Sequence, residues 1–276
     1  MTDFCLHSNC EIYALFGNPV GHSLSPMMHN AAYRGMKLQA LYVPFCVNDL
    51  ADAVRGMKAL GIHGASITIP FKTAIMPFLN TVDDDARIIG AVNTVANRDG
   101  VLEGINTDWI GLTHAIQSQF DIAGRTFTIL GAGGAARAVV FAIIKGGGIP
   151  IVVYRSEGKA KALAIQFQCA TVPFSEFHNL TGDCLINATP VGMSPHIDES
   201  PVSSRNLARY SWVMDLIYNP LETRLLRDAR QAGCNTISGL DMFIYQGAEQ
   251  IKFWTGIEPP LNTMRNAVRK HLEWIR

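Results

Sequence analysis

One segment of the chain carries the residue types that a dinucleotide-binding turn needs. Residues 126–138 read TFTILGAGGAARA, an apolar run, then a glycine-rich turn, then residues typical of a helix. Gly131 permits a tight turn, Gly133 lets the backbone approach a pyrophosphate, and Ala136 allows close packing of helix on strand. The amino end of the helix offers free N–H groups to phosphate oxygens. The segment therefore predicts a nucleotide cofactor, and the other interpretation is a purely structural glycine turn.

The residues after the next predicted strand indicate which dinucleotide binds. In NAD sites an acidic residue at the end of this strand binds the ribose hydroxyls. Here the strand 149–154 is followed by Arg155 and then by Lys159, two cations that can pair with a 2′-phosphate. Glu157 is the nearest acid, and it lies past the strand end. The pattern favours NADP, with NAD as the alternative and a solvated loop as the non-functional interpretation.

Two further residues have the chemistry for a proton transfer. Moving a hydride from an alcohol carbon to nicotinamide requires removal of the hydroxyl proton, by a group that can hold a proton and a partner that orients it. Lys72 follows Pro70 closely after the predicted strand 65–69, so it emerges at a carboxyl end, where open α/β sheets bind ligands. Asp108 precedes a predicted helix. Taken singly, Lys72 also fits a solvated lysine at a helix start and Asp108 also fits an N-cap.

The elements that must position these residues follow from the hydrophobic pattern. Apolar, β-rich runs alternate with segments of helical period, which is typical of parallel α/β architecture. We expect strands at 12–16, 41–45, 65–69, 126–130, 149–154, 185–187 and 212–216, and helices at 26–36, 50–60, 109–120, 135–145, 159–168 and 223–232. Residues 91–105 differ, because two β-like runs flank Asn97-Arg98-Asp99-Gly100, a strong hairpin signal. Residues 241–276 predict two helices broken at Glu258-Pro259-Pro260.

The pattern predicts an α/β fold of two domains. Residues 1–109 form an N-terminal α/β domain, and residues 110–237 form a Rossmann-type, doubly wound NAD(P)-binding domain.

Seven short motifs, in order along the chain, resemble those of the shikimate dehydrogenase family. They are residues 17–30 (GNPVGHSLSPMMHN), 66–72 (SITIPFK), 90–94 (GAVNT), 104–108 (GINTD), 187–193 (NATPVGM), 215–220 (DLIYNP) and 239–246. The resemblance implies reversible NADP-dependent reduction of 3-dehydroshikimate to shikimate, in aromatic amino acid biosynthesis by way of chorismate. It also implies that the first domain binds the substrate and carries the catalytic residues, and that residues 238–276 pack back on this domain.

The resemblance assigns roles to individual residues. It implies that Lys72 and Asp108 form a catalytic pair around the reacting hydroxyl. Substrate contacts are expected at Ser23, Ser25, Ser66, Thr68, Lys72, Asn93, Asp108, Tyr218 and Gln246. Cofactor contacts are expected at Gly131, Ala132, Gly133, Gly134, Ala135, Tyr154, Arg155, Ser156, Lys159, Thr189, Leu216 and Gly239. The two serines before Pro26 suit a carboxylate at a helix amino end, and Ser25 is also a candidate N-cap.

The chain departs from the family pattern at two positions. Ser66 stands where the family usually has asparagine, and Tyr154 replaces the asparagine common before the cofactor-binding arginine. Serine is shorter and lacks the paired donor and acceptor of an amide. The substrate therefore stays open among shikimate, quinate and an amino-substituted relative. The alternatives are an NAD-dependent quinate/shikimate or aminoshikimate dehydrogenase and a non-catalytic metabolite-binding homologue.

Composition narrows the class of partner. The chain has 276 residues and a formal charge of zero, which removes the main electrostatic reason to bind nucleic acid or an anionic membrane. We expect a small-molecule substrate and a monomer or homodimer. No run approaches the roughly 18 apolar residues of a membrane span, and the first residues lack a signal-peptide pattern.

The cysteines and histidines do not predict a metal site. Six cysteines (5, 10, 46, 169, 184 and 234) contain no CxxC pair, so we interpret them as single, mostly buried thiols in a reducing cytoplasm. The first two are expected in a mobile leader. His22 and His29 have no cysteine or glutamate that completes a ligand set, and turn and packing roles are favoured for them.

Overall fold

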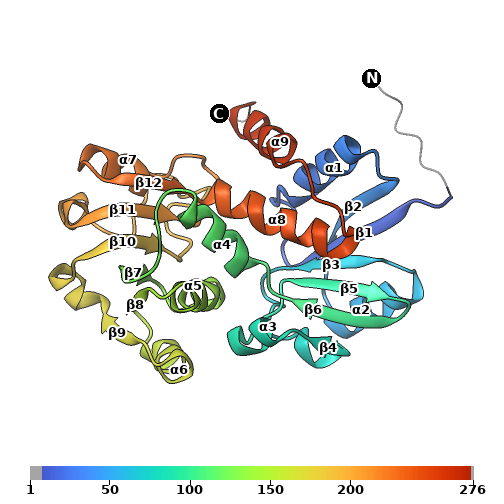
Figure 1. Ribbon diagram of the computed structural model, residues 1–276, viewed down its shortest axis with the longest axis horizontal. Helices are drawn as coiled ribbons and strands as arrows, with labels where there is room; N and C mark the ends of the chain where they lie inside the picture. The colour runs from blue at the N-terminus through green and yellow to red at the C-terminus, as the bar shows by residue number, and fades with distance from the viewer. Residues whose placement is uncertain (1–7, 275–276) are drawn as a thin grey trace. The chain divides into compact units, whose positions relative to one another are not determined.

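The structure is a computed structural model that describes residues 8–274, and the chain forms two compact units (Figure 1). The first comprises residues 8–107 and 247–274, and the second comprises residues 108–246. The chain returns to the first unit inside helix α8 (Gly239–Thr255). The predicted second boundary, residue 238, lies just before this helix, whereas the units divide within it.

The first unit is built on a mixed six-stranded sheet. Its strands are β1 (Glu11–Gly17), β2 (Ala40–Cys46), β3 (Gly64–Ile67), β4 (Thr81–Val82), β5 (Thr94–Arg98) and β6 (Val101–Ile105). Their order is β2-β1-β3-β5-β6-β4, with β1 parallel to β2 and β3, and β5 antiparallel to β3 and β6. The carboxyl ends of β1 and β3 therefore lie at the same edge as the amino end of β5.

The helices of this unit bury apolar residues that recur at helical spacing. They are α1 (Ser25–Met36), α2 (Leu50–Ala59), α3 (Asp84–Ile89), the end of α8 and α9 (Leu261–Trp274), with a short 3₁₀ helix at Met76–Phe78. The end of α8 contacts the sheet through Gln250 and Trp254, and α9 packs on α1. Helix α2 begins at the N-cap Asp49, whose side chain accepts from the Asp52 N–H at 2.9 Å. It buries Leu50, Val54 and Met57 in one of the unit's apolar cores.

The predicted hairpin is confirmed. Strands β5 and β6 pair Asn97 with Leu102 and Arg98 with Val101, which leaves a two-residue turn. Asp99 and Gly100 both have positive φ, 53° and 88°, as a type I′ turn requires. The side chain of Asn97 accepts a hydrogen bond from the Gly100 N–H at 2.8 Å and closes the turn.

The second unit is a doubly wound parallel sheet. Its strands are β7 (Thr126–Leu130), β8 (Ile149–Tyr154), β9 (Ala170–Pro173), β10 (Gly182–Asn187), β11 (Tyr210–Asp215) and β12 (Asn235–Ser238). All neighbours are parallel in the order β12-β11-β10-β7-β8-β9. The chain reverses direction across the sheet between β7 and β10, and ligands of such sheets bind at that switch point. The predicted two-domain α/β fold with a Rossmann-type second domain is confirmed.

The connections of the second unit are helical. They are α4 (Asp108–Gln117), α5 (Gly134–Lys145), α6 (Glu157–Phe167), α7 (Arg224–Gln231) and the start of α8, with 3₁₀ helices η2 (Phe174–Asn179) and η3 (Ser204–Arg209). Helices α4 and α5 pack together over a core that includes Phe127, Val139 and Ile186.

The pattern missed seven short elements: the strands β4, β9 and β12, the helix α3, and the three 3₁₀ helices at Met76–Phe78, Phe174–Asn179 and Ser204–Arg209. Strand β4 has two residues, and β12 (NTIS) turns one large apolar side chain, Ile237, into the core. All three missed strands lie at sheet edges. Edge strands are covered on fewer sides than central ones, so their sequences need little apolar periodicity.

Candidate functional site

In the first unit, the predicted substrate residues gather at the edge where β1 and β3 end and β5 begins. The Thr68 N–H donates to the Phe16 carbonyl at 2.9 Å, and the Ile67 N–H donates to the Asn93 carbonyl at 2.8 Å. The Val92 N–H donates to the carbonyl of Lys72 at 2.8 Å, so the half-buried Lys72 is tied to the residue before Asn93. This edge thus brings Thr68, Lys72 and Asn93 into one neighbourhood.

The two serines sit at the start of α1. Ser25 is the first helical residue, and Leu24 holds the N-cap position without a side-chain hydrogen bond. The expectation that Ser25 is the N-cap is wrong. The Ser23 hydroxyl instead accepts from the Ser25 N–H at 3.2 Å. Pro26 occupies the first turn, where its missing N–H is of no consequence.

Asn93 is the most heavily hydrogen-bonded of these residues. Its amide nitrogen donates to the Thr107 hydroxyl at 3.0 Å, and its amide oxygen accepts from the Thr107 N–H at 2.7 Å and from the Thr94 hydroxyl at 2.8 Å. Asn93 is 2 % exposed, and both threonines are fully buried. Because a buried amide with several partners has one allowed orientation, the network fixes the Asn93 side chain. Thr107 is followed in the chain by Asp108, the first residue of α4 and not its N-cap.

The Ser66 hydroxyl is already used inside the first unit. It accepts a hydrogen bond from the Tyr42 hydroxyl at 2.6 Å and donates one to the Gln250 side-chain oxygen at 2.9 Å. The Gln250 amide nitrogen then donates to the Thr94 hydroxyl at 3.1 Å and to the Asn93 carbonyl at 3.3 Å. Ser66 therefore lies in a buried chain of hydrogen bonds that leads to Asn93. This geometry argues against the expectation that Ser66 presents its hydroxyl to the substrate.

We expect the Ser66→Asn variant to lower the free energy of unfolding by about 1–3 kcal/mol, the usual effect of overfilling a packed interior. Ser66 is 5 % exposed and lies between Tyr42 and Gln250, so the longer amide has little room. Urea titration measures the change. Adding Gln250→Ala, which removes the neighbouring side chain, should recover part of the loss. Unchanged stability, with an altered preference among ring acids, would instead support direct contact between Ser66 and substrate.

In the second unit, a cavity of about 390 Å³ opens at the switch point between β7 and β10. Its walls include seven of the predicted cofactor residues, and it has the size of an ordinary ligand pocket. The lining residues are Leu130, Gly131, Ala132, Gly133, Val153, Arg155, Ser156, Lys159, Phe174, Ala188, Thr189, Pro190, Val191 and Pro201.

The glycine turn fits a pyrophosphate. Gly131 has φ +106°, and a Cβ on it would lie 2.9 Å from the Thr189 methyl group, so this position requires glycine. A Cβ on Gly133 or Gly134 would meet no atom within 4 Å, so the backbone there faces open space. Gly133 is the N-cap of α5, and no side chain of the described residues caps this helix. The first N–H groups of α5 are therefore available to an anion.

Two positively charged side chains, Arg155 and Lys159, follow β8 and lie on the wall of the same cavity. Arg155, Ser156 and Lys159 line it, and Arg155 makes no hydrogen bond or ion pair with any residue from 8 to 274. Glu157, the nearest acid, is exposed and pairs with Lys161 at 2.8 Å. The Lys161 ammonium holds the pKa of that carboxyl below its usual range. The cavity wall thus presents positive charge suited to a phosphate dianion.

A buried carboxylate holds the loop on the opposite wall. Asp215 accepts from the Asn187 amide at 3.0 Å, the Ile217 N–H at 3.1 Å and the Thr223 hydroxyl at 2.7 Å. The Asn187 oxygen in turn accepts from the N–H and hydroxyl of Thr189 at 3.0 and 2.7 Å. Burial raises the pKa of Asp215 to about 6, against the lowering effect of these donors. The network therefore joins the segment 187–189 to the segment 215–217 by hydrogen bonds.

Other predicted residues lie outside the cavity lining. Gly134 and Ala135 begin α5, and half-buried Tyr154 ends β8. Gly239 packs on the backbone of Leu216, where a Cβ would lie 2.4 Å from the Leu216 carbonyl carbon. These five predicted residues therefore lie in three places: the start of α5, the end of β8, and the contact between Gly239 and Leu216.

In the second unit, Tyr218 and Gln246 both contact Phe243. The Tyr218 ring stacks on that of Phe243 at 4.2 Å, and the Gln246 amide donates to the Phe243 carbonyl at 3.0 Å. Gln250 and Phe174 lie in no motif that the sequence singles out. Gln250 stands one helical turn beyond Gln246, a spacing that places both on one face of α8.

The histidines and cysteines have the packing roles expected, with one exception. His29 is fully buried, stacks on Tyr42 at 4.1 Å and has its pKa lowered to about 4, mainly by burial. His22 lies exposed in the turn before α1. Of the five described cysteines none is in a disulfide, but only Cys184 and Cys234 are buried, so "mostly buried" is wrong. The sixth lies outside the described residues.

Two absences apply to residues 8–274. No group of three metal-ligating side chains lies close enough to hold an ion. No helix there is both long and apolar enough to cross a membrane.

Comparison with known proteins agrees with this arrangement. Residues 15–95 match the model of the shikimate dehydrogenase substrate binding domain, and residues 239–269 match that of the shikimate 5'-dehydrogenase C-terminal domain. The chain is 46% identical to a shikimate dehydrogenase (NADP(+)) of Pyrococcus abyssi, over 95% of this chain and 98% of that one.

Solved structures agree as well. A shikimate dehydrogenase in complex with NADP+ superposes with a TM-score of 0.90 at 40% identity, covering 97% of this chain and 98% of that one. The Thermus thermophilus enzyme, in complex with NADP(H) and shikimate, gives a TM-score of 0.87 at 35% identity, covering 94% and 99%. By sequence and by fold along nearly its whole length, this chain belongs to the shikimate dehydrogenase family.

Proposed function

We propose that the chain is an NADP-dependent alcohol dehydrogenase that reversibly reduces 3-dehydroshikimate to shikimate. The observation that carries the proposal is the cavity at the β7–β10 switch point, with a glycine turn on one wall and Arg155 and Lys159 on another. It occurs in a chain whose relatives along nearly their whole length are named shikimate dehydrogenase (NADP(+)).

The cofactor residues divide by chemistry. The N–H groups of the Gly131–Gly134 turn and of the first turn of α5 would hold the pyrophosphate. Arg155, Ser156 and Lys159 would hold the 2′-phosphate, since Glu157 is paired with Lys161. NADP, when bound, accepts or supplies the hydride of the reaction.

The substrate residues are proposed from their positions within each unit. Ser23 and Ser25, at the start of α1, would bind the ring carboxylate. Asn93, fixed by its threonine partners, and Thr68 would bind ring hydroxyls, because an amide and a hydroxyl both donate and accept. Tyr218 and Gln246 are further proposed contacts from the second unit.

Lys72 and Asp108 are proposed as the catalytic residues. Lys72 follows β3 at the edge that carries Asn93, so its ammonium is the candidate to hold the hydroxyl proton as the hydride moves. Asp108 follows Thr107, whose position Asn93 fixes, and supplies the second proton-handling group. Removal of either should leave substrate binding less affected than turnover.

A steady-state screen of shikimate and quinate against NADP+ and NAD+ tests the function. We expect the highest kcat/KM for shikimate with NADP+. A preference for quinate with NAD+ would favour the quinate/shikimate alternative, and an amino-substituted analogue in the same screen tests the aminoshikimate one. Binding of shikimate without turnover would favour a metabolite-binding homologue.

We expect the Arg155→Ala variant to weaken NADP+ binding by about 1.5–3 kcal/mol, the worth of a charged hydrogen bond. NAD+ lacks the 2′-phosphate, so its affinity should be nearly unchanged. Calorimetric titration of both cofactors measures the difference. Arg125→Ala is a matched control, because Arg125 also lies over a phenylalanine ring but does not line the cofactor cavity. Equal losses for both cofactors would assign Arg155 to support of the loop.

We also propose a reducing cytoplasmic location and a monomeric or homodimeric state without nucleic acid or membrane partners. The unpaired state of the five described cysteines and the formal charge of zero support this.

A further inference from the structure

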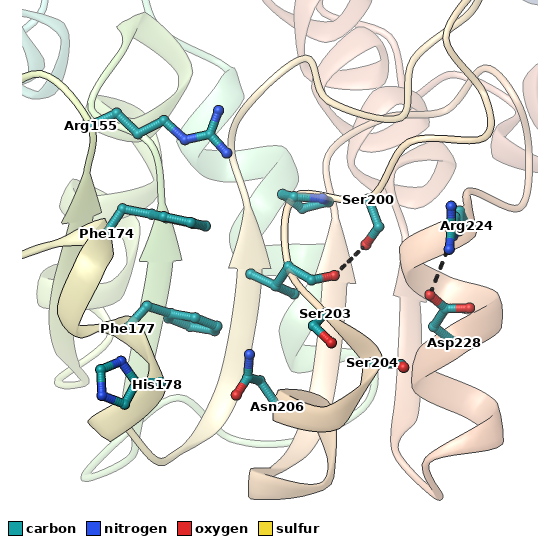
Figure 2. A pocket seen from close by; sticks show the side chains of 12 residues that line it. Arg155, Phe174, Phe177, His178, Ser200, Ser203, Ser204, Asn206, Arg224 and Asp228 are labelled. Carbon is teal, nitrogen blue, oxygen red and sulfur yellow. Dashed lines mark hydrogen bonds and ion pairs between the residues drawn. The ribbon is translucent and has the colours of Figure 1, made fainter.

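The guanidinium of Arg155 rests on a column of aromatic rings (Figure 2). Its Cζ lies 4.7 Å from the centre of the Phe174 ring. The Phe174 and Phe177 rings stack with centres 6.0 Å apart and an angle of 10°, and Phe177 stacks in turn on Tyr210 at 6.4 Å and 6°. Figure 2 shows Arg155, Phe174 and Phe177 one above another along the wall.

The local sequence explains the first two steps of the column. Phe174 and Phe177 are three residues apart in the 3₁₀ helix η2. Side chains at i and i+3 of a 3₁₀ helix eclipse one another, because the helix has three residues per turn. The Phe174-Ser-Glu-Phe177 spacing therefore stacks the two rings.

The base of the column is fixed in the core. Phe177 and Tyr210 are each 4 % exposed and belong to one apolar cluster with Val213 and Leu225. Phe174 is half-buried and packs against that cluster. The ring that supports Arg155 is thus held by rings that cannot easily turn.

Phe174 and Arg155 stand where two cavities meet. Both residues line the cofactor cavity of about 390 Å³ and a neighbouring cavity of about 600 Å³. A ring under one face of a guanidinium leaves the N–H groups at its edge open to an anion. No residue within 8–274 takes up those N–H groups. The Phe174 ring therefore restrains the Arg155 side chain without using its N–H donors. A side chain that is restrained before binding loses less conformational entropy on binding, so the affinity for an anion is higher.

We propose that Phe174 is a positioning residue that orients Arg155 toward the 2′-phosphate and so contributes to selection of NADP over NAD. The inference rests on the proposed function, since it assigns a support to the residue that reads the phosphate there. Phe174 acts on the cofactor through Arg155.

The test compares calorimetric Kd values of NADP+ and NAD+ for four variants: Phe174→Leu, Phe174→Tyr, Arg155→Ala and the Phe174→Leu/Arg155→Ala double variant. Phe174→Leu should raise the Kd of NADP+ about two- to fivefold, the range of a partly exposed cation–π contact, and leave that of NAD+ unchanged. Phe174→Tyr keeps the ring and should stay near wild type. In the Arg155→Ala background, Phe174→Leu should have no further selective effect.

Phe120→Leu is the matched control, because Phe120 makes the same kind of contact with Arg125 (5.3 Å) and does not line the cofactor cavity. It should change neither Kd. Equal losses of both cofactors in Phe174→Leu, no loss, or a selective loss that persists without Arg155 would overturn the inference. If the wild type binds NADP+ no better than NAD+, the cofactor assignment itself fails, and this inference fails with it. The wild-type comparison thus separates the two failures.

Discussion

Replacing Lys72 with alanine is expected to lower kcat by about 10²–10⁴, the usual contribution of general acid–base catalysis, with a smaller effect on KM. The physical reason is that the hydroxyl proton then leaves to water without a positioned acceptor. Steady-state kinetics with shikimate and NADP+ measure both constants.

The pH profile and a second variant make this expectation specific. Lys72→Arg keeps the positive charge, but a guanidinium does not give up its proton in proteins, so it should also be slow. Circular dichroism and the midpoint of thermal unfolding check that both variants fold. Near-native kcat for Lys72→Ala between about pH 6 and 10 would show that another group accepts the proton.

Replacing Asp215 with alanine is expected to lower the free energy of unfolding by at least about 3 kcal/mol, about 1 kcal/mol for each of three buried donors left without an acceptor. The donors are the Asn187 amide, the Ile217 N–H and the Thr223 hydroxyl. Thr223 is also the N-cap of α7, so the start of that helix should loosen. Urea titration followed by circular dichroism gives the change.

The Asp215→Asn variant is the matched control and carries a pH test. Its amide oxygen can still accept from two donors, and its NH₂ can donate to the Thr223 oxygen, so the loss should be smaller. Burial raises the pKa of the native Asp215 to about 6, above its unfolded value. The native state then binds more protons than the unfolded state between about pH 4 and 6, and stability falls as pH rises through that window.

The difference in stability between wild type and Asp215→Asn isolates this effect from other carboxylates. From about pH 4 to 7 the wild type should lose on the order of 3 kcal/mol relative to the variant. A pH-independent difference would mean that Asp215 is ionised in the native state down to its ordinary pKa.

Short-range features of the sequence were enough to predict several parts of the fold. The glycine turn after β7, the Asp99-Gly100 hairpin and the break at Glu258-Pro259-Pro260 each depend on neighbouring residues alone, and each occurs as predicted. Backbone dihedral preferences and side-chain periodicity act over a few residues, so they can be read without the tertiary structure. The edge strands β4, β9 and β12 were not predicted, because their short sequences carry little apolar periodicity.

The sequence by itself determined the two-domain α/β class, the glycine turn and the cations after β8. Tertiary structure alone decided which of the predicted site residues use their polar groups in contacts with other side chains of the protein. Ser66 meets Gln250, 184 residues away in the chain, and so loses the free hydroxyl that its motif implied. Glu157 pairs with Lys161, while Arg155 keeps its donors and lies on Phe174 of η2, a 3₁₀ helix that no sequence pattern predicted. The physical reason is that hydrogen bonds and ring contacts are satisfied by whatever lies nearest in space, and that proximity is set by long-range packing.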